Sequence, residues 1–283
     1  MNFKHTDDFQ SVALDAMREA TRAVLDVYQS SDLGISYKAE KEPVTEADLR
    51  ANSILEKALG ELLPEAGWLS EESDRDLHEL ASREYLWVVD PIDGTREFID
   101  RNGEFAISVG LLQHGEPVWG AISLPAEPRI VITAESGVEV FDLETRLEPP
   151  KRLLDKSAVD LRQSSICVSR TEWDRGLYRD QMQDLKIKPE GSVARKLALV
   201  SLGEYDLTVS LYPKNDWDIA GGLALIKAAG GLIIRPDMGT GIELKPPGAR
   251  RPGLCCGRPD PVMQYHQYFQ HKGLKLRDKY GAD

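Results

Sequence analysis

Cysteine is scarce in this sequence of 283 residues, which contains three of them. Three cysteines do not build the disulfide framework that stabilises small secreted domains. The adjacent pair Cys255 and Cys256 would suit a metal or redox site, but no second pair or histidine cluster accompanies it. We therefore expect Cys167, Cys255 and Cys256 to be buried free thiols, and we do not expect a zinc site.

The sequence also lacks an uninterrupted apolar run long enough to cross a lipid bilayer. Its first ten residues, MNFKHTDDFQ, do not show the basic-then-apolar pattern of a secretory signal. These two absences predict an intracellular, cytoplasmic protein without strong membrane association.

Positive charge is in the minority, because 35 Lys and Arg residues stand against 47 Asp and Glu residues, a formal net charge of -12. Nonspecific binding to DNA, RNA or anionic membranes requires clustered basic residues, so we expect no nucleic-acid polymer as a partner. The balance does not oppose a small phosphorylated substrate, because bound divalent cations can reverse the local electrostatic field.

What the sequence does contain is the composition of an ordinary globular protein, 41% hydrophobic and 29% charged. Its length allows one large domain or two coupled subdomains. Apolar residues recur at three- and four-residue steps over 8–28 and again over 46–62, which predicts two amphipathic helices. Short apolar runs bounded by turn residues predict four strands, at 87–90, 105–112, 117–124 and 130–133. A hairpin turn at 114–116 is expected to join the second strand to the third.

The second half of the chain alternates between strands and helices. We expect strands at 164–169, 206–211 and 231–234, and helices at 172–185, 193–202 and 219–229. This alternation indicates helices that cover a sheet, so the predicted fold class is α/β with an α+β N-terminal part. The polar stretch 142–160 is the predicted boundary between subdomains 1–150 and 151–283. Residues 245–261 are expected to form a surface loop, interrupted only by an apolar run at 254–256.

Two aspartates, Asp90 and Asp93, directly follow an apolar strand in the segment VVDPIDGT. Carboxylates this close at the end of a buried strand repel each other unless a cation neutralises them, and hard oxygen ligands suit Mg²⁺. Pro91 would fix a turn here, Gly94 would let the backbone approach a ligand, and Thr95 would open the next helix. The alternative is an ordinary Asp-Pro-x-Asp-Gly surface turn.

Three further acidic segments each have an ordinary explanation when taken alone. Glu71 and Glu72 suit the solvated start of a helix, and Asp218, beside Trp217, suits a plain N-cap. Asp48 lies just inside the first turn of a predicted helix, where a surface carboxylate complements the helix dipole. Taken together with the aspartate pair, these acids make a shared metal site the better interpretation.

The segments PVTEAD, SEES, DPIDGT and WDIAGG, in this order and spacing, resemble the inositol monophosphatase superfamily of Mg²⁺-dependent, lithium-sensitive phosphatases. The resemblance covers nearly the whole chain, and it rests on the combination because any one segment alone is weak. It implies a layered αβαβα sugar-phosphatase fold. It also implies an enzyme that hydrolyses phosphate monoesters with about two or three Mg²⁺ ions in its site.

The same resemblance assigns roles to individual residues. Four carboxylates and one backbone carbonyl are implied to hold the metal ions, those of Glu71, Asp90, Asp93, Asp218 and Ile92. Asp48 is implied to orient Thr95, which polarises a water molecule for in-line attack on phosphorus. The residues implied to contact the substrate are Glu71, Gly94, Thr95, Lys196 and Asp218.

Three details are closer to the 3'(2'),5'-bisphosphate nucleotidase branch of the superfamily. The segment GTREFIDRNGEF at 94–105 resembles that branch's GTKEFI-RNGEF stretch, where inositol phosphatases usually read GTTNF. Ser70 stands where inositol phosphatases tend to have Gly, and Lys196 stands where they have Asn. The implied reaction is hydrolysis of adenosine 3',5'-bisphosphate to AMP and phosphate. Alternatively, Arg101 and Glu104 form a surface ion pair and Lys196 is a solvated helix residue.

Other functions stay open at this point. An inositol monophosphatase, or a broader sugar-phosphate phosphatase, would use the same metal ligands. A non-catalytic sensor of phosphorylated ligands would be expected to lack a metal ligand or the pair Asp48 and Thr95, and none of these residues is missing. The resemblance allows a monomer or a homodimer.

Overall fold

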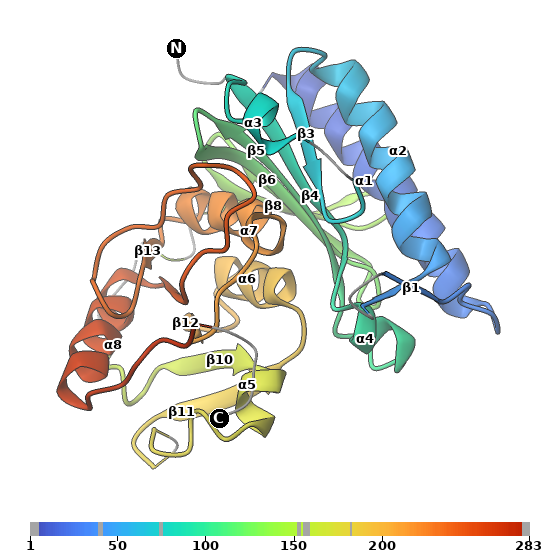
Figure 1. Ribbon diagram of the computed structural model, residues 1–283. Helices are drawn as coiled ribbons and strands as arrows, with labels where there is room; N and C mark the ends of the chain where they lie inside the picture. The colour runs from blue at the N-terminus through green and yellow to red at the C-terminus, as the bar shows by residue number, and fades with distance from the viewer. Residues whose placement is uncertain are drawn as a thin grey trace.

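The chain folds into five alternating layers of helices and sheets in the computed structural model, which describes residues 6–38, 42–73, 76–151, 154, 159–181 and 183–278. An outer pair of helices covers a seven-stranded sheet, a second pair lies between that sheet and a five-stranded one, and the last helix covers the far side (Figure 1). The predicted α/β fold class with an αβαβα order of layers is confirmed.

The larger sheet has its strands in chain order and is antiparallel except for its first pair, β3 and β4. Its strands are β3 (Gly67–Ser70), β4 (Tyr85–Asp93), β5 (Ala106–Gln113), β6 (Glu116–Leu124), β7 (Arg129–Ala134), β8 (Gly137–Phe141) and β9 (Arg146–Lys151). The four strands predicted from apolar runs are β4 to β7. A two-stranded sheet, β1 (Ser36–Tyr37) with β2 (Pro43–Val44), and the short helix α3 (Leu77–Leu80) lie outside it.

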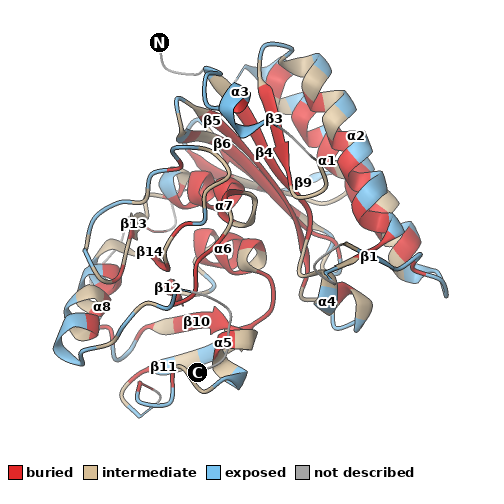
Figure 2. Cartoon of the chain, viewed as in Figure 1, coloured by how far each residue is buried: buried red, intermediate tan, exposed pale blue. Residues whose placement is uncertain are grey.

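Both faces of the larger sheet are buried. Along β4, Trp87 and Val89 pack with helices α1 (Asp7–Gln29) and α2 (Glu46–Leu62), while Leu86 and Val88 pack on the opposite side. Because neighbouring residues of a strand point to opposite faces, a strand covered on both sides needs a continuous apolar run. The helices are buried only towards the sheet, as the striped colouring of α1 and α2 shows (Figure 2).

The middle layer consists of α6 (Val193–Ser201) and α7 (Asp216–Ala228). Helix α7 lies in backbone contact with the larger sheet, because glycines meet where they cross. A Cβ atom on Gly221 would lie 2.6 Å from the carbonyl oxygen of Val109, and one on Gly110 would lie 2.7 Å from the amide nitrogen of Gly221. These contacts place the start of α7 close to the end of β4, which decides the geometry of the site.

We expect Gly221→Ala to destabilise the protein by about 1–3 kcal/mol, because overpacking against backbone atoms forces the helix off the sheet. Gly60→Ala, in α2, is the matched control, since a Cβ atom there has no neighbour within 4 Å. That change should be neutral or stabilising by up to about 1 kcal/mol, because Ala is the better helix former. Urea denaturation of both variants checks the prediction, and equal stability of the two would contradict it.

The smaller sheet has the strand order β11-β10-β12-β14-β13, with parallel pairs around β10 and antiparallel pairs around β14. Its strands are β10 (Ser165–Ser169), β11 (Lys186–Glu190), β12 (Leu207–Ser210), β13 (Leu232–Ile234) and β14 (Leu254–Gly257). Helix α8 (Pro259–His271) packs on its outer face, and α5 (Arg170–Asp174) follows β10. The three cysteines are buried free thiols in this sheet, as predicted.

One sequence prediction in this half is wrong, and another is right only in part. The helix expected at 172–185 ends at Asp174, because Gly176 takes a left-handed conformation at φ 74° and the Glu172 carboxylate bonds the amides of Leu211 and Tyr212. The loop expected at 245–261 is present up to residue 253; the apolar run that interrupts it is the buried strand β14, and the expected loop after it is replaced by the start of α8. The apolar run there is too short to show a period, and β12 and β13 pair with it from both sides.

Strand β9 continues the larger sheet into the polar stretch where a subdomain boundary was predicted. Part of that stretch, 152–153 and 155–158, lies outside the described residues. Among the helices of the described chain, none combines the length and apolar character needed to cross a membrane.

Candidate metal centre

The end of β4 brings two carboxylates to one face of the sheet. In a regular strand Asp90 and Asp93 would point to opposite faces, because they are three residues apart. However, the pairing with β5 shifts here: Asp90 lies opposite Ser108 and Asp93 opposite Ala106, so β4 carries one extra residue. Such a bulge rotates the strand and turns both side chains the same way. The turn predicted at Pro91 is therefore a bulge within the strand.

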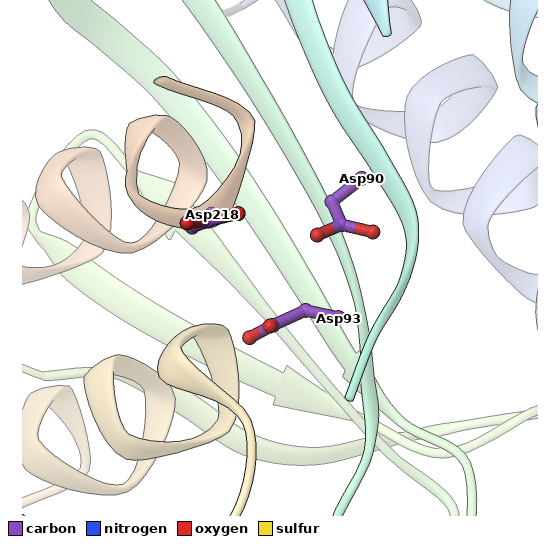
Figure 3. A group of neighbouring side chains, drawn as sticks. All are labelled: Asp90, Asp93 and Asp218. Atoms are coloured by element: carbon purple, nitrogen blue, oxygen red, sulfur yellow. The ribbon is translucent and has the colours of Figure 1, made fainter. Parts of the chain in front are cut away.

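A third carboxylate comes from the first turn of α7. Oxygen atoms of Asp90, Asp93 and Asp218 all lie within 4.8 Å of one another, and the three side chains converge from β4 and α7 (Figure 3). Asp90 is buried, and the other two are partly exposed. The close packing of α7 on the sheet is what brings Asp218 within reach of β4.

Asp48 and Asp218 are held in the same way, at the third position of a helix. The Asp218 carboxylate accepts a hydrogen bond from the amide of Asn215 at 2.9 Å, and the Asp48 carboxylate accepts one from the amide of Thr45 at 2.8 Å. These are capping boxes, which fix a carboxylate at the beginning of a helix. Asp218 therefore takes part in the capping of its helix and also belongs to the group Asp90, Asp93 and Asp218, which we call the acidic cluster. Asp48 is buried, so the alternative of a surface carboxylate is wrong for this residue.

Burial and mutual repulsion make these acids bind protons strongly. Burial first, then neighbouring carboxylates, hold the pKa of Asp90 well above its ordinary value. The same two causes raise the pKa of Asp218 to about 7 and that of Glu71 to about 7. Burial raises the pKa of Asp48 to about 6. A divalent cation relieves this repulsion, and carboxylate oxygens are the ligands that Mg²⁺ prefers, so these residues fit a Mg²⁺ site.

Glu71 lies at the edge of the cluster, directly after β3. Its pKa is raised in part by Asp218, so the two carboxylates are close enough to repel each other. Lys38 stands beside it: the ammonium group lies 3.4 Å from a carboxylate oxygen of Glu71 and 2.6 Å from one of Glu72. Sequence reasoning did not identify Lys38, which lies beside a two-residue strand without a recognisable motif.

The remaining residues of the DPIDGT segment surround the cluster. The hydroxyl of Thr95 donates to the carbonyl oxygen of Ile92 at 3.2 Å, and Gly94 takes a left-handed conformation before the short helix α4 (Thr95–Ile99). The Asp48 carboxylate accepts a hydrogen bond from the hydroxyl of Thr45 at 2.6 Å. Within the described chain no hydrogen bond joins Asp48 to Thr95, so their predicted pairing stays a prediction.

Asp93 is held from the C-terminal half of the chain. Its carboxylate accepts the hydroxyl of Ser192 at 2.6 Å and the amide of Ala194 at 2.5 Å. Lys196 lies behind this turn, fully buried, and its ammonium donates to the carbonyl oxygens of residues 190, 191 and 192. The solvated position considered for Lys196 is therefore wrong, and its predicted contact with substrate stays a prediction. No motif or spacing in the sequence had marked Ser192 as a residue of the site.

A cavity of about 720 Å³ lies towards the other end of α7, between that helix and residues 231–252. None of the predicted site residues lines it. Two of its cations are already paired, Lys227 with Glu116 and Arg235 with Asp237. The predicted metal-binding carboxylates therefore lie outside this cavity.

Comparison with known proteins identifies the family of this chain. The inositol monophosphatase family matches residues 5–269. The chain belongs to the inositol monophosphatase family. This membership confirms the resemblance that the four acidic segments showed, and it makes the protein a phosphatase of that family.

Relatives include both branches weighed above. The 3'(2'),5'-bisphosphate nucleotidase CysQ of Escherichia coli strain K12 is 32% identical over 216 residues, which cover 75% of this chain and 85% of that protein. The inositol monophosphatase of Dictyostelium discoideum is 28% identical over 248 residues, covering 82% and 86%. The crystal structure of CysQ from Bacteroides thetaiotaomicron, described as a bacterial member of the family, aligns with a TM-score of 0.70 at 25% identity, covering 88% and 96%.

Proposed function

We propose that this family member is a Mg²⁺-dependent phosphomonoesterase that hydrolyses adenosine 3',5'-bisphosphate to AMP and phosphate. The observation that carries the phosphatase chemistry is the convergence of three carboxylates, within 4.8 Å, from two halves of the chain. The nucleotide substrate is supported by the relatives named 3'(2'),5'-bisphosphate nucleotidase and by the RNGEF segment. Lithium inhibition and a cytoplasmic location are part of the proposal.

In this proposal Asp90, Asp93, Asp218 and Glu71, with the carbonyl of Ile92, hold the cations. When bound, the cations neutralise the phosphate dianion and lower the pKa of the attacking water. Asp93 is pre-oriented by the two donors from the C-terminal half, and Asp218 by its capping box. Such fixed ligands reduce the reorganisation needed during the reaction.

The water-activating role falls to Thr95 and Asp48. Thr95 would leave the carbonyl of Ile92, to which it now donates, and accept a proton from the attacking water. Asp48 is held by Thr45 with its carboxylate buried, which suits a fixed acceptor for the proton that Thr95 passes on. The amides of Gly94 and Thr95 are proposed to hold phosphate oxygens.

A substrate panel with Mg²⁺ tests the proposed substrate. We expect kcat/KM for adenosine 3',5'-bisphosphate to exceed that for inositol 1-phosphate and for a sugar phosphate by at least about tenfold, the discrimination that a few pocket contacts provide. Phosphate release is measured for each substrate, with chelated metal as the control. A higher kcat/KM for inositol 1-phosphate would instead make the protein an inositol monophosphatase, the alternative that the Dictyostelium relative favours.

A further inference from the structure

The segment Arg101–Phe105, which first suggested the nucleotidase branch, lies beside the acidic cluster but contributes no member to it. Arg101 donates to the carbonyl oxygen of Ser30 at 2.6 Å and lies over the ring of Tyr28, so it does not pair with Glu104. The surface ion pair considered for these two residues is therefore wrong. The side chain of Asn102 accepts the amide of Glu104 at 2.8 Å, and this turn leaves the Glu104 carboxylate free to bind elsewhere.

Glu104 reaches across to the C-terminal half of the chain. Its carboxylate binds the guanidinium of Arg170 through two oxygens, each 2.6 Å from the same nitrogen atom. One of those oxygens also accepts the amide of Gly191 at 2.6 Å. Arg170 therefore neutralises the charge of Glu104 close to an already acidic site. The hydrogen bond from the Gly191 amide to Glu104 is directional, so it fixes the position of the Gly191 backbone.

The turn that Glu104 binds is the one that holds Asp93. A Cβ atom on Gly191 would lie 2.9 Å from the backbone oxygen of Glu104, so the two backbones are in direct contact. The next residue, Ser192, has φ 45°, a conformation that residues with a side chain adopt only when surrounding contacts impose it. Lys196 supplies contacts from one side by donating to three carbonyls of this turn, and Glu104 supplies them from the other.

Ser192 passes this restraint to the cluster, because its hydroxyl and the amide of Ala194 both bind one carboxylate oxygen of Asp93. We propose that Glu104 is a positioning residue, which fixes the Asp93 carboxylate for cation binding through the turn Glu190–Ser192. This inference rests on the proposed function, since it takes Asp93 as a metal ligand. In this proposal Glu104 acts through the turn, and its own carboxylate binds Arg170 and the amide of Gly191.

The test measures Mg²⁺ affinity directly, by calorimetric titration of the full chain, with melting temperature recorded alongside. Glu104→Ala should raise the Mg²⁺ dissociation constant by about tenfold or more, the usual cost of losing a group that orients a metal ligand. Glu104→Gln keeps an oxygen that can accept the Gly191 amide, so its affinity should stay near wild type. Glu116→Gln is the matched control, because Glu116 also forms an ion pair, but with Lys227 of α7 and not with a residue beside the turn.

A merely structural role would lower the melting temperature of Glu104→Ala and leave its Mg²⁺ affinity unchanged, and that result would overturn the proposal. If Glu104→Ala does not fold, Glu104→Asp keeps the charge beside Arg170 but shortens the side chain by one methylene, which withdraws the carboxylate from the Gly191 amide. Weaker Mg²⁺ binding in that variant supports the proposal, and unchanged binding contradicts it. A wild-type protein that binds Mg²⁺ but hydrolyses nothing in the substrate panel would refute the proposed function alone, since the affinity comparison still decides the role of Glu104.

Discussion

Asp93→Asn is expected to reduce Mg²⁺-dependent phosphate release by at least about 100-fold, since even losing a group that orients a metal ligand costs about 10- to 100-fold. The change removes a carboxylate from a cluster whose oxygens lie within 4.8 Å, and an amide is a weaker ligand for a hard cation. The hydroxyl of Ser192 and the amide of Ala194 can still donate to the side-chain oxygen that the substituted amide retains, so the turn should keep its place.

Removing one of several repelling charges should leave the metal-free protein as stable as wild type or more stable. A loss of activity together with an unchanged or higher melting temperature therefore separates a functional defect from unfolding. Asp100→Asn is the control, because Asp100 ends helix α4 on the exposed surface. Undiminished hydrolysis by Asp93→Asn would refute the metal assignment, and it would favour a different site of reaction.

Mg²⁺ should stabilise the protein against heat, and more strongly at pH 8 than at pH 5.5. A ligand present at 100 times its dissociation constant stabilises the native state by about 2.7 kcal/mol. The pH dependence follows from the acids of the cluster. Burial and like charges raise the pKa of Glu71 and Asp218 to about 7 in the folded protein, from ordinary values of 4.5 and 3.8.

The direction follows from where these groups bind protons. Between about pH 4 and pH 7 the folded, metal-free state holds more protons than the unfolded state, so this contribution to stability falls as pH rises. At pH 8 the acids are ionised and repel, and Mg²⁺ relieves the full repulsion. At pH 5.5 Mg²⁺ has to displace protons first, which reduces its effect.

Calorimetric melting with and without Mg²⁺ at the two pH values measures this difference. Sodium chloride of equal ionic strength is the control, because it screens charge without entering an oxygen-lined site. An equal Mg²⁺ effect at both pH values, or none at either, would contradict the proposed cluster of protonated acids.

The local sequence pattern predicted helices and strands well where nearby residues supply the hydrogen bonds and apolar contacts that define them. Helix α2 has the predicted bounds, because its apolar face repeats regularly and a capping box begins it. The prediction failed where a distant segment competes for the same groups. The helix expected from Glu172 onwards stops early. The carboxylate of Glu172 instead accepts hydrogen bonds from the backbone amides of Leu211 and Tyr212, which lie 39 and 40 residues further along the chain.

The acidic cluster shows the same division. The sequence by itself determined the family and the residue types of the site, because DPIDGT and WDIAGG place carboxylates beside an apolar strand and an apolar helix. Only the tertiary structure decided that these carboxylates meet. Asp90 and Asp93 share a face because β4 carries a bulge, and Asp218 joins them because glycines let α7 lie against the sheet.

The supports of the site were also decided by tertiary structure alone. Ser192 and Glu104 are ordinary polar residues in the sequence, about 90 positions apart, and nothing local connects them. They act on one site because the turn at 190–192 lies between Asp93 and the segment 101–105. Residue types and periodicity are local properties that a sequence displays directly. The direction of a hydrogen bond between distant segments exists only once the layers have packed, because packing alone sets the distance and angle between them.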